Sequence, residues 1–124
     1  MVQKILIFNF FFLLLFLSNN FSNAKVIEGR ANIIDGDTIH INKNKIRLHA
    51  IDAPETKQTC LTDLKKWRCG KQSTIELKKM ISNRIIRCEV NDIDIYNRYV
   101  ANCFTNKINL NQLILKRPFI GSFF

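Results

Sequence analysis

The strongest constraint on the fold is a series of short β-branched runs, separated by turn residues, in the first half of the chain. These runs are residues 26–34, 38–41 and 45–51. Asp35-Gly36-Asp37 provides the first turn, and residues 42–44 provide a hairpin tip because Asn tolerates left-handed backbone angles. Pro54 ends the third run by withholding a backbone donor. The pattern predicts three strands joined by tight turns.

In the second half of the chain, the apolar residues change from alternate positions to helical spacing and back to alternate positions. Ser73-Thr74-Ile75-Glu76 has the form of a capping box, which predicts a helix from about residue 70 or 73 to residue 82. Further strands are expected over residues 84–90 and 98–104, followed by a short helix over residues 109–116. The resulting order, β-β-β-α-β-β-α, predicts a mainly β domain with helices (α+β), built as a five-stranded OB-fold barrel.

Residues 1–24 have the order of regions that is typical of a secretory signal peptide. Lys4 precedes an apolar run over residues 5–17, and small residues at Ser22 and Ala24 precede the expected cleavage point. An uncleaved membrane anchor is the alternative, but the run is shorter than the roughly 20 residues of a spanning helix. We therefore expect a secreted or periplasmic protein whose domain is residues 25–124, without a stable membrane partner after cleavage.

Four cysteines lie in this expected domain, and an even number in an exported chain predicts two disulfides. A zinc site is the competing use, but the chain lacks close C-x-x-C pairs and has two histidines. If residues 84–90 and 98–104 form a hairpin, Cys88 and Cys103 are nearly opposite, while Cys60 and Cys69 close a short loop. The predicted pairs are therefore Cys60 with Cys69 and Cys88 with Cys103. Each contributes on the order of 2–4 kcal/mol to a small domain.

The chain of 124 residues carries a net charge of +9, and removal of Lys4 with residues 1–24 leaves +8. Such a balance favours a polyanionic partner such as nucleic acid. Against this background Asp37 begins the second strand and Asp52 follows the third, so both are expected at one barrel mouth. Carboxylates that converge suit Ca²⁺ or Mg²⁺. The simpler alternative is that Asp35-Gly36-Asp37 serves only as a turn.

Arg47 lies on the strand that leads to Asp52, and alternation places it with His49 and Ile51, on the expected inward or mouth-facing side. A guanidinium group matches phosphate with two parallel hydrogen bonds. The alternative for Arg47 is a structural salt bridge with a nearby aspartate, and both alternatives remain open from the sequence alone.

Four segments together resemble the thermonuclease family, the staphylococcal-nuclease-type OB-fold nucleases. The segments are IDGDT at 34–38, RL at 47–48, IDAPE at 51–55 and DIYNR at 94–98. They follow in order within about residues 25–116, and the cysteine-bearing segment 58–70 is similar to the exported bacterial branch of that family. The resemblance extends to a helix at 109–116, after which most relatives continue into a third helix that is expected to be missing here. Apolar residues such as Phe119 and Phe124 are expected to cover the surface instead, and the alternative is that they promote aggregation.

The resemblance implies a role for each matching position. Arg47, Glu55 and Arg98 match catalytic residues. A Ca²⁺ cofactor is implied at the carboxylates of Asp37 and Asp52 and the carbonyl of Ala53, where threonine is common. Tyr96 is an implied substrate contact, although it is equally compatible with a place at the edge of the core. Lys43, in the hairpin tip, is a candidate phosphate contact, and the alternative is an exposed lysine without a specific role. Asn97 stands where glycine is usual, which requires a left-handed backbone.

The implied activity is hydrolysis of phosphodiester bonds in DNA or RNA by an exported, Ca²⁺-dependent, monomeric nuclease that leaves 3′-phosphate and 5′-hydroxyl ends. Glu55 would then take a proton from the attacking water or orient it. The alternative is an OB-fold module that binds nucleic acid without cutting it, as a shortened descendant of a nuclease would.

Overall fold

The computed structural model describes residues 2–4 and 23–117. The expected signal peptide falls largely outside these residues, and so do the apolar residues expected to cover the end of the domain, including Phe119 and Phe124. Within the described residues, no helix combines the length and apolar character needed to cross a bilayer.

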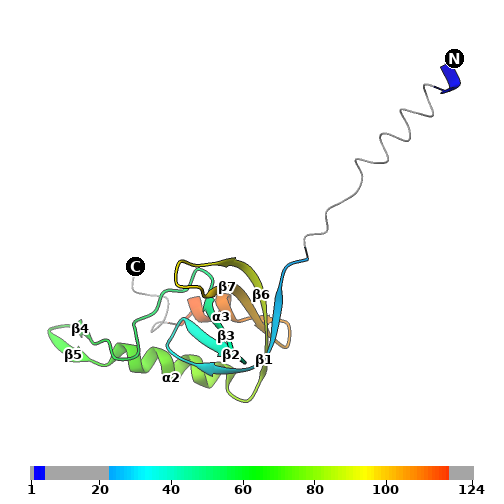
Figure 1. Cartoon of the computed structure of the whole chain (residues 1–124). Helices are drawn as coiled ribbons and strands as arrows, with labels where there is room; N and C mark the ends of the chain where they lie inside the picture. Colours follow the sequence, from blue (N-terminus) through cyan, green and yellow to red (C-terminus); the bar gives the residue numbers. More distant parts are fainter. Residues whose placement is uncertain (1, 5–22, 118–124) are drawn as a thin grey trace.

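The predicted five-stranded barrel is confirmed. Its strands are β1 (Val26–Ile33), β2 (Thr38–Ile41), β3 (Asn44–Leu48), β6 (Ile85–Ile93) and β7 (Tyr99–Thr105). Neighbouring strands pair antiparallel in the order β3-β2-β1-β6-β7, and a parallel pairing of β3 with β7 closes the sheet on itself (Figure 1). The remaining elements are β4 (Cys60–Thr62), β5 (Lys65–Trp67), β8 (Ile108–Asn109), α2 (Cys69–Ile81) and α3 (Leu110–Leu115).

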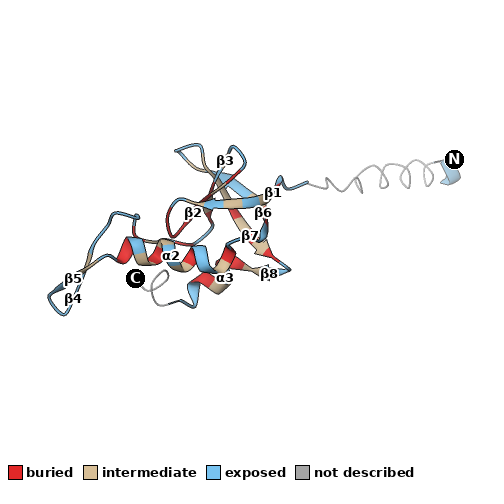
Figure 2. Ribbon diagram, turned by 90° about the horizontal axis from the view of Figure 1, so that it is seen from below, coloured by how far each residue is buried: buried red, intermediate tan, exposed pale blue. Residues whose placement is uncertain are grey.

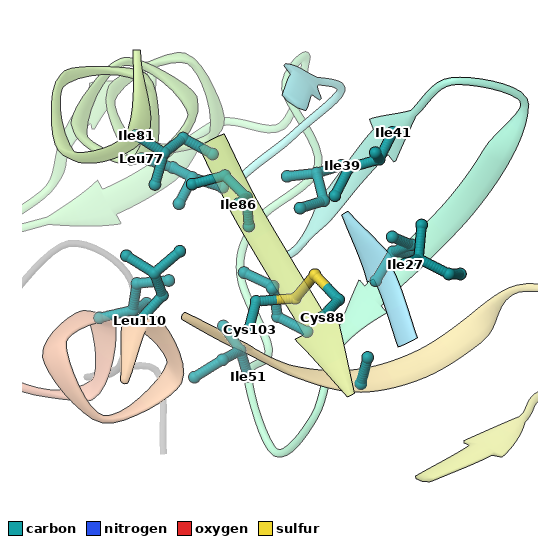
Figure 3. Close-up of a cluster of buried hydrophobic side chains, with 14 residues drawn as sticks. Ile27, Ile39, Ile41, Ile51, Leu77, Ile81, Ile86, Cys88, Cys103 and Leu110 are labelled. Carbon is teal, nitrogen blue, oxygen red and sulfur yellow. A yellow bond between two sulfur atoms is a disulfide. The ribbon is translucent and has the colours of Figure 1, made fainter. Parts of the chain in front are cut away.

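The core fills the barrel because alternate residues of each strand point inward. Isoleucine dominates it, and β-branched side chains suit a pleated surface. Helices α2 and α3 turn their buried sides toward the barrel (Figure 2). Figure 3 shows the side chains that meet there. The fully buried set includes Ile39, Ile41, Ile46, Leu48, Ile51, Leu77, Ile81, Ile86, Leu110 and Ile114.

Both predicted disulfides are present. Cys88 and Cys103 lie opposite each other on β6 and β7, and their bond is fully buried in the core (Figure 3). Cys60 and Cys69 join the first residue of β4 to the first residue of α2. One bond therefore fastens the barrel wall, and the other fastens a surface hairpin to a helix.

The third strand ends earlier than the sequence predicts, and the assignment of faces beyond it is wrong. β3 stops at Leu48 because Ala50 adopts a left-handed backbone, with a φ of 58°. This turn reverses the alternation, so that Ile51 is buried and Ala50 is exposed. The segment after this turn carries Asp52 and returns to the Asp turn, where the Ala53 N–H donates to Asp37.

The predicted first helix is confirmed as α2 and begins close to the earlier of its two expected starts, but its predicted capping box is wrong. α2 begins at Cys69, and Ser73 lies inside it, where its hydroxyl donates to the Cys69 carbonyl oxygen at 3.0 Å. The segment before the helix, expected as a short loop closed by Cys60 and Cys69, forms the β4–β5 hairpin, with Cys60 paired to Trp67. Asp63 and Leu64 make its tight turn, with φ values of 50° and 64°. In both general views this hairpin projects beyond the end of α2, away from the barrel (Figures 1 and 2).

Candidate active site

Three of the predicted site residues meet at one edge of the barrel. Arg47 on β3 directs one guanidinium nitrogen, Nη1, to Oδ2 of Asp37 at 2.9 Å. Its Nη2 lies 3.5 Å from Oδ1 of Asp52, in the loop after β3. One arginine therefore holds two carboxylates from different loops. Asp37 lies in the β1–β2 loop, and Asp52 lies in the loop after β3.

The position of Asp37 follows from the turn that precedes β2. The Asp35 carboxylate accepts the backbone N–H of Asp37 at 3.2 Å, which is the local bond expected of an Asp turn. The Asp37 carboxylate in turn accepts the hydroxyl of Thr38 at 2.8 Å and the backbone N–H of Ala53 at 3.2 Å. Asp37 thus fixes the loop that carries Asp52 as well as orienting Arg47.

Burial sets the electrostatics of this group. The carboxyl groups of Asp35 and Asp37 are both buried, while that of Asp52 is exposed. Burial raises the pKa of Asp37, and the neighbouring Asp35 raises it further, although Thr38 and Arg47 act in the opposite direction. For Arg47, partial burial lowers the pKa, but the carboxylates of Asp37 and Asp52 outweigh it and the net direction is upward. Arg47 therefore stays charged, and its ion pair does not fully offset the burial of Asp37.

Arg47 does not face the core, contrary to one of the two orientations allowed by the sequence. Its neighbours Ile46 and Leu48 are buried, so alternation turns Arg47 to the outer side of the barrel. In the parallel pairing of β3 with β7, Arg47 is the register partner of Val100. Arg98 lies two residues before Val100, in the turn that leads into β7.

The β6–β7 turn holds Arg98 in place through Asp94. One oxygen of Asp94 accepts the Arg98 Nε–H at 2.7 Å, and the other accepts the backbone N–H groups of Tyr96 and Arg98. Desolvation acts to raise the pKa of Asp94, but these hydrogen bonds and the Arg98 charge bring it below its usual value. Asn97 adopts the left-handed backbone that the sequence requires, with a φ of 60°.

Tyr96 and Lys43 both project into solvent. Tyr96 is 72% exposed, which excludes a place at the edge of the core, and its ring lies 5.3 Å from the Arg98 guanidinium carbon. Lys43 is exposed in the β2–β3 turn. Neither residue contacts the Asp37–Arg47–Asp52 group within the described part of the chain.

Glu55 is exposed, and residues that the sequence did not single out hold its loop. The carbonyl oxygen of Glu55 accepts the N–H of Gln58 at 2.8 Å, and the Gln58 carbonyl oxygen accepts the N–H of Gly70 at 3.2 Å. The hydroxyl of Thr56 donates to the Ile34 carbonyl oxygen at 2.8 Å, just before the Asp turn. The Glu55 loop is therefore tied both to the start of α2 and to the turn that carries Asp37.

Asn111 holds the backbone just after β3 through hydrogen bonds. From the sequence we expected only that this residue lies in the second helix. Its side chain accepts the N–H of Cys103 at 2.9 Å and donates to the carbonyl oxygens of His49 and Ala101 at 2.9 and 3.2 Å. Asn111 is buried in α3. It therefore satisfies backbone groups where the chain leaves β3 toward Asp52.

The carboxylates at this edge are oxygen donors of the kind that hard cations prefer. Asp35, Asp37 and Asp52 contribute three negative charges and Arg47 contributes one positive charge, which leaves an excess that a divalent cation would neutralise. Across the described residues no group of three or more His, Cys, Asp or Glu side chains is placed to hold a metal ion alone. A set of two carboxylates, a backbone carbonyl and water is nevertheless an ordinary hard-cation shell. Asp37 and Asp52 thus supply hard oxygen donors of the kind that Ca²⁺ takes.

Comparisons with known proteins find a family and several relatives that the chain resembles. The sequence profile of a family described as "Staphylococcal nuclease homologue" matches residues 45–119. The succinoglycan biosynthesis protein ExoI of Rhizobium meliloti (strain 1021) is 40% identical over 92 residues, which cover 73% of this chain and 48% of ExoI. The probable staphylococcal-like nuclease CAN2 of Oryza sativa subsp. japonica is 31% identical over 80 residues, which cover 64% of this chain and 19% of CAN2. The matched regions thus span about half or less of these curated relatives.

Proposed function

The chain belongs to the family of staphylococcal nuclease homologues, and from this premise we propose that it hydrolyses phosphodiester bonds in DNA or RNA. The observation that carries the proposal is the contact of Arg47 with both Asp37 and Asp52, because it assembles a guanidinium and two hard anionic ligands at one edge of the barrel. These are the groups that a phosphodiester needs around it. The net charge of +9 would attract the polymer.

The proposed reaction divides the work among three residues. Glu55, exposed and close in sequence to Asp52, accepts the proton of the attacking water or orients that water. Arg47 and Arg98 donate hydrogen bonds to phosphoryl oxygens as negative charge builds on them in the transition state. When bound at Asp37, Asp52 and Ala53, Ca²⁺ would add positive charge for the same oxygens. The proposed products carry 3′-phosphate and 5′-hydroxyl ends.

Residues of the β6–β7 and β2–β3 turns support these roles. Asp94 holds the guanidinium of Arg98 at 2.7 Å, so the arginine is ordered before substrate arrives. Tyr96 and Lys43 are exposed, and we propose that they contact the substrate beside the cleaved bond.

The proposed location is secreted or periplasmic, and the proposed state is a monomer. Two disulfides within a domain of this size are typical of an oxidising compartment. The name of ExoI refers to a polysaccharide, but a glycosidic bond offers no phosphoryl oxygen for the two arginines. A phosphodiester is therefore the better substrate class for this set of residues.

The second candidate function is nucleic-acid binding without cleavage. The observation that favours it is that the Arg47 guanidinium already pairs with Asp37 at 2.9 Å, as a purely structural arginine would. Cleavage requires Arg47 to share its donors with a phosphate, whereas binding alone does not.

The test is cleavage of plasmid DNA, single-stranded DNA and RNA by the purified, oxidised protein, with Ca²⁺ or with a chelator. We expect cutting with Ca²⁺ that the chelator abolishes. Glu55→Ala should lower the rate by roughly 10²–10⁴-fold. Glu28→Ala, which removes an exposed glutamate on β1, is the matched control and should leave the rate unchanged. Retention of nucleic acid without cutting under every condition would establish the binding module instead.

A further inference from the structure

A second group of cations lies beside the Glu55 loop, outside the Asp37–Arg47–Asp52 group. It surrounds a pocket of about 440 Å³ between this loop and the start of α2. The residues that line the pocket are Thr56, Lys57, Gln58, Thr59, Arg68 and Lys71. We call it the cation pocket.

Within residues 23–117, the three basic residues of the cation pocket have no acidic partner. Lys57, Arg68 and Lys71 are all exposed. The ion pairs in this part of the chain involve none of them, although Glu55 is only two residues from Lys57. Three like charges around one hollow repel one another, and an anion bound between them would relieve that repulsion. The pocket is therefore prepared for a negatively charged ligand.

The cation pocket is fastened to the loop that carries Glu55. Lys57 lies inside the turn that the Glu55–Gln58 backbone bond closes at 2.8 Å, and the Gly70 N–H joins Gln58 at 3.2 Å. The Cys60–Cys69 disulfide closes the β4–β5 hairpin next to Arg68. An anion held in the pocket would therefore lie at a fixed position relative to the backbone of Glu55.

We propose that the cation pocket binds a backbone phosphate of the nucleic-acid substrate, next to the phosphodiester that is cleaved. The inference rests on the proposed function, which supplies a polymer with an anion at every nucleotide. Arg68 can hold two phosphate oxygens at once, and the two lysines add compact positive charges. Contacts to phosphate carry no base information, so the pocket strengthens binding without selecting a sequence.

The test compares two variants that lose the same charge at different places. The pocket variant is Lys57→Gln/Arg68→Gln/Lys71→Gln. The control variant is Arg30→Gln/Lys78→Gln/Arg84→Gln, which removes the three cations of a separate hollow of about 320 Å³ toward the other end of α2. Binding of a fluorescent single-stranded oligonucleotide is measured with a chelator present, over a range of salt concentrations, for both variants and the unchanged protein.

The pocket variant should bind about tenfold more weakly at low salt, against about twofold for the control, because only the pocket variant can no longer hold the phosphate. The slope of log affinity against log salt should fall by roughly 0.7 for each phosphate that the variant no longer neutralises. Lys57→Arg/Lys71→Arg keeps the charges and should keep the affinity. Since all three residues are exposed, thermal unfolding should show that each variant remains folded.

Equal weakening by the pocket and control variants would overturn the proposal, because charge alone would then explain binding. Unchanged binding by the pocket variant would overturn it as well. These outcomes are separate from the proposed hydrolysis, since binding is measured without metal. A protein that never cuts nucleic acid but shows the tenfold difference would retain the cation pocket and lose the nuclease assignment.

Discussion

Gly70→Ala tests whether the start of α2 positions Glu55. Gly70 is the second residue of α2 and packs against the backbone of the Glu55 loop. A Cβ added at residue 70 would lie 1.7 Å from the Glu55 carbonyl oxygen and 2.7 Å from its carbonyl carbon. Real Cβ contacts essentially never fall below 3.0 Å, so loop and helix must separate by about 1.3 Å, the difference between 3.0 and 1.7 Å.

The magnitude follows from two opposing effects. Alanine is the better helix former by up to about 1 kcal/mol, and this gain would stabilise the variant if no contact opposed it. Overpacking against backbone costs about 1–3 kcal/mol, since neither the carbonyl nor the helix can rotate away. We expect a net loss of about 1–2 kcal/mol in the free energy of unfolding, or a fall in Tm of roughly 5–10 °C for a domain of this size.

The effect on activity should be larger than the effect on stability. A displacement of about 1 Å at a catalytic group can cost on the order of 10²-fold in rate. We therefore expect kcat for single-stranded DNA to fall about a hundredfold at a temperature where the variant is folded. Lys78→Ala, at an exposed position of the same helix, is the control and should change neither Tm nor rate appreciably.

The assay combines thermal unfolding by circular dichroism with initial rates under Ca²⁺. A Gly70→Ala protein with a higher Tm than the unchanged protein and full activity would refute the reasoning, because helix propensity would then be the only effect. A lower Tm with an unchanged rate would separate loop packing from catalysis and remove Glu55 from the proposed mechanism.

Three further predictions concern the support of the site. Asn111→Ala removes three hydrogen bonds from a buried side chain to the backbone and should lower the free energy of unfolding by about 2–4 kcal/mol in chemical denaturation. A change of about 0.5 kcal/mol or less would contradict the role assigned to this side chain. Cys88→Ala/Cys103→Ala should lower the free energy of unfolding by about 3 kcal/mol. A thiol-alkylation assay under native conditions should find this bond more resistant to reduction than the Cys60–Cys69 bond, because Cys88 and Cys103 are both fully buried whereas Cys60 is only half-buried. Asp94 has a lowered pKa in the folded protein, so its contribution is complete above the pKa of the unfolded chain and is lost as pH falls through the folded value. The Tm difference between the unchanged protein and Asp94→Asn should therefore shrink below about pH 3.8, and a constant difference from pH 2 to 6 would show that the charged contact with Arg98 does not stabilise the fold.

The barrel could be predicted because each of its strands carries a local signal. Alternating β-branched residues mark the strands, and Asn42 and Asn97 mark turns through their tolerance of left-handed angles, which both adopt. The pairing of Cys88 with Cys103 followed from the expected hairpin and is confirmed. These features depend on residues close in sequence or on one pair of strands.

The departures occur where distant packing outweighs local preference. Ala50 has no intrinsic tendency toward a left-handed angle, yet it turns so that Ile51 can enter the core. The Ser73–Glu76 motif favours a helix start, but the disulfide at Cys69 and the contact of Gly70 with the Glu55 loop place the first turn four residues earlier. Strands of three residues, as in β4 and β5, are too short for alternation to show.

The candidate site shows the same division between local and distant causes. Gly36 was recognised as a turn residue, but its small size matters more for packing: a Cβ there would lie 2.6 Å from the Cβ of Ala53 and 2.9 Å from that of Ser73. Three small residues thus let the Asp turn, the loop after Asp52 and helix α2 touch at one point. A larger residue at any of the three would push these segments apart and lengthen the 3.2 Å bond between Ala53 N–H and Asp37. Alanine at residue 53 is therefore matched to Gly36, and the distance between the two carboxylates that flank Arg47 depends on that match.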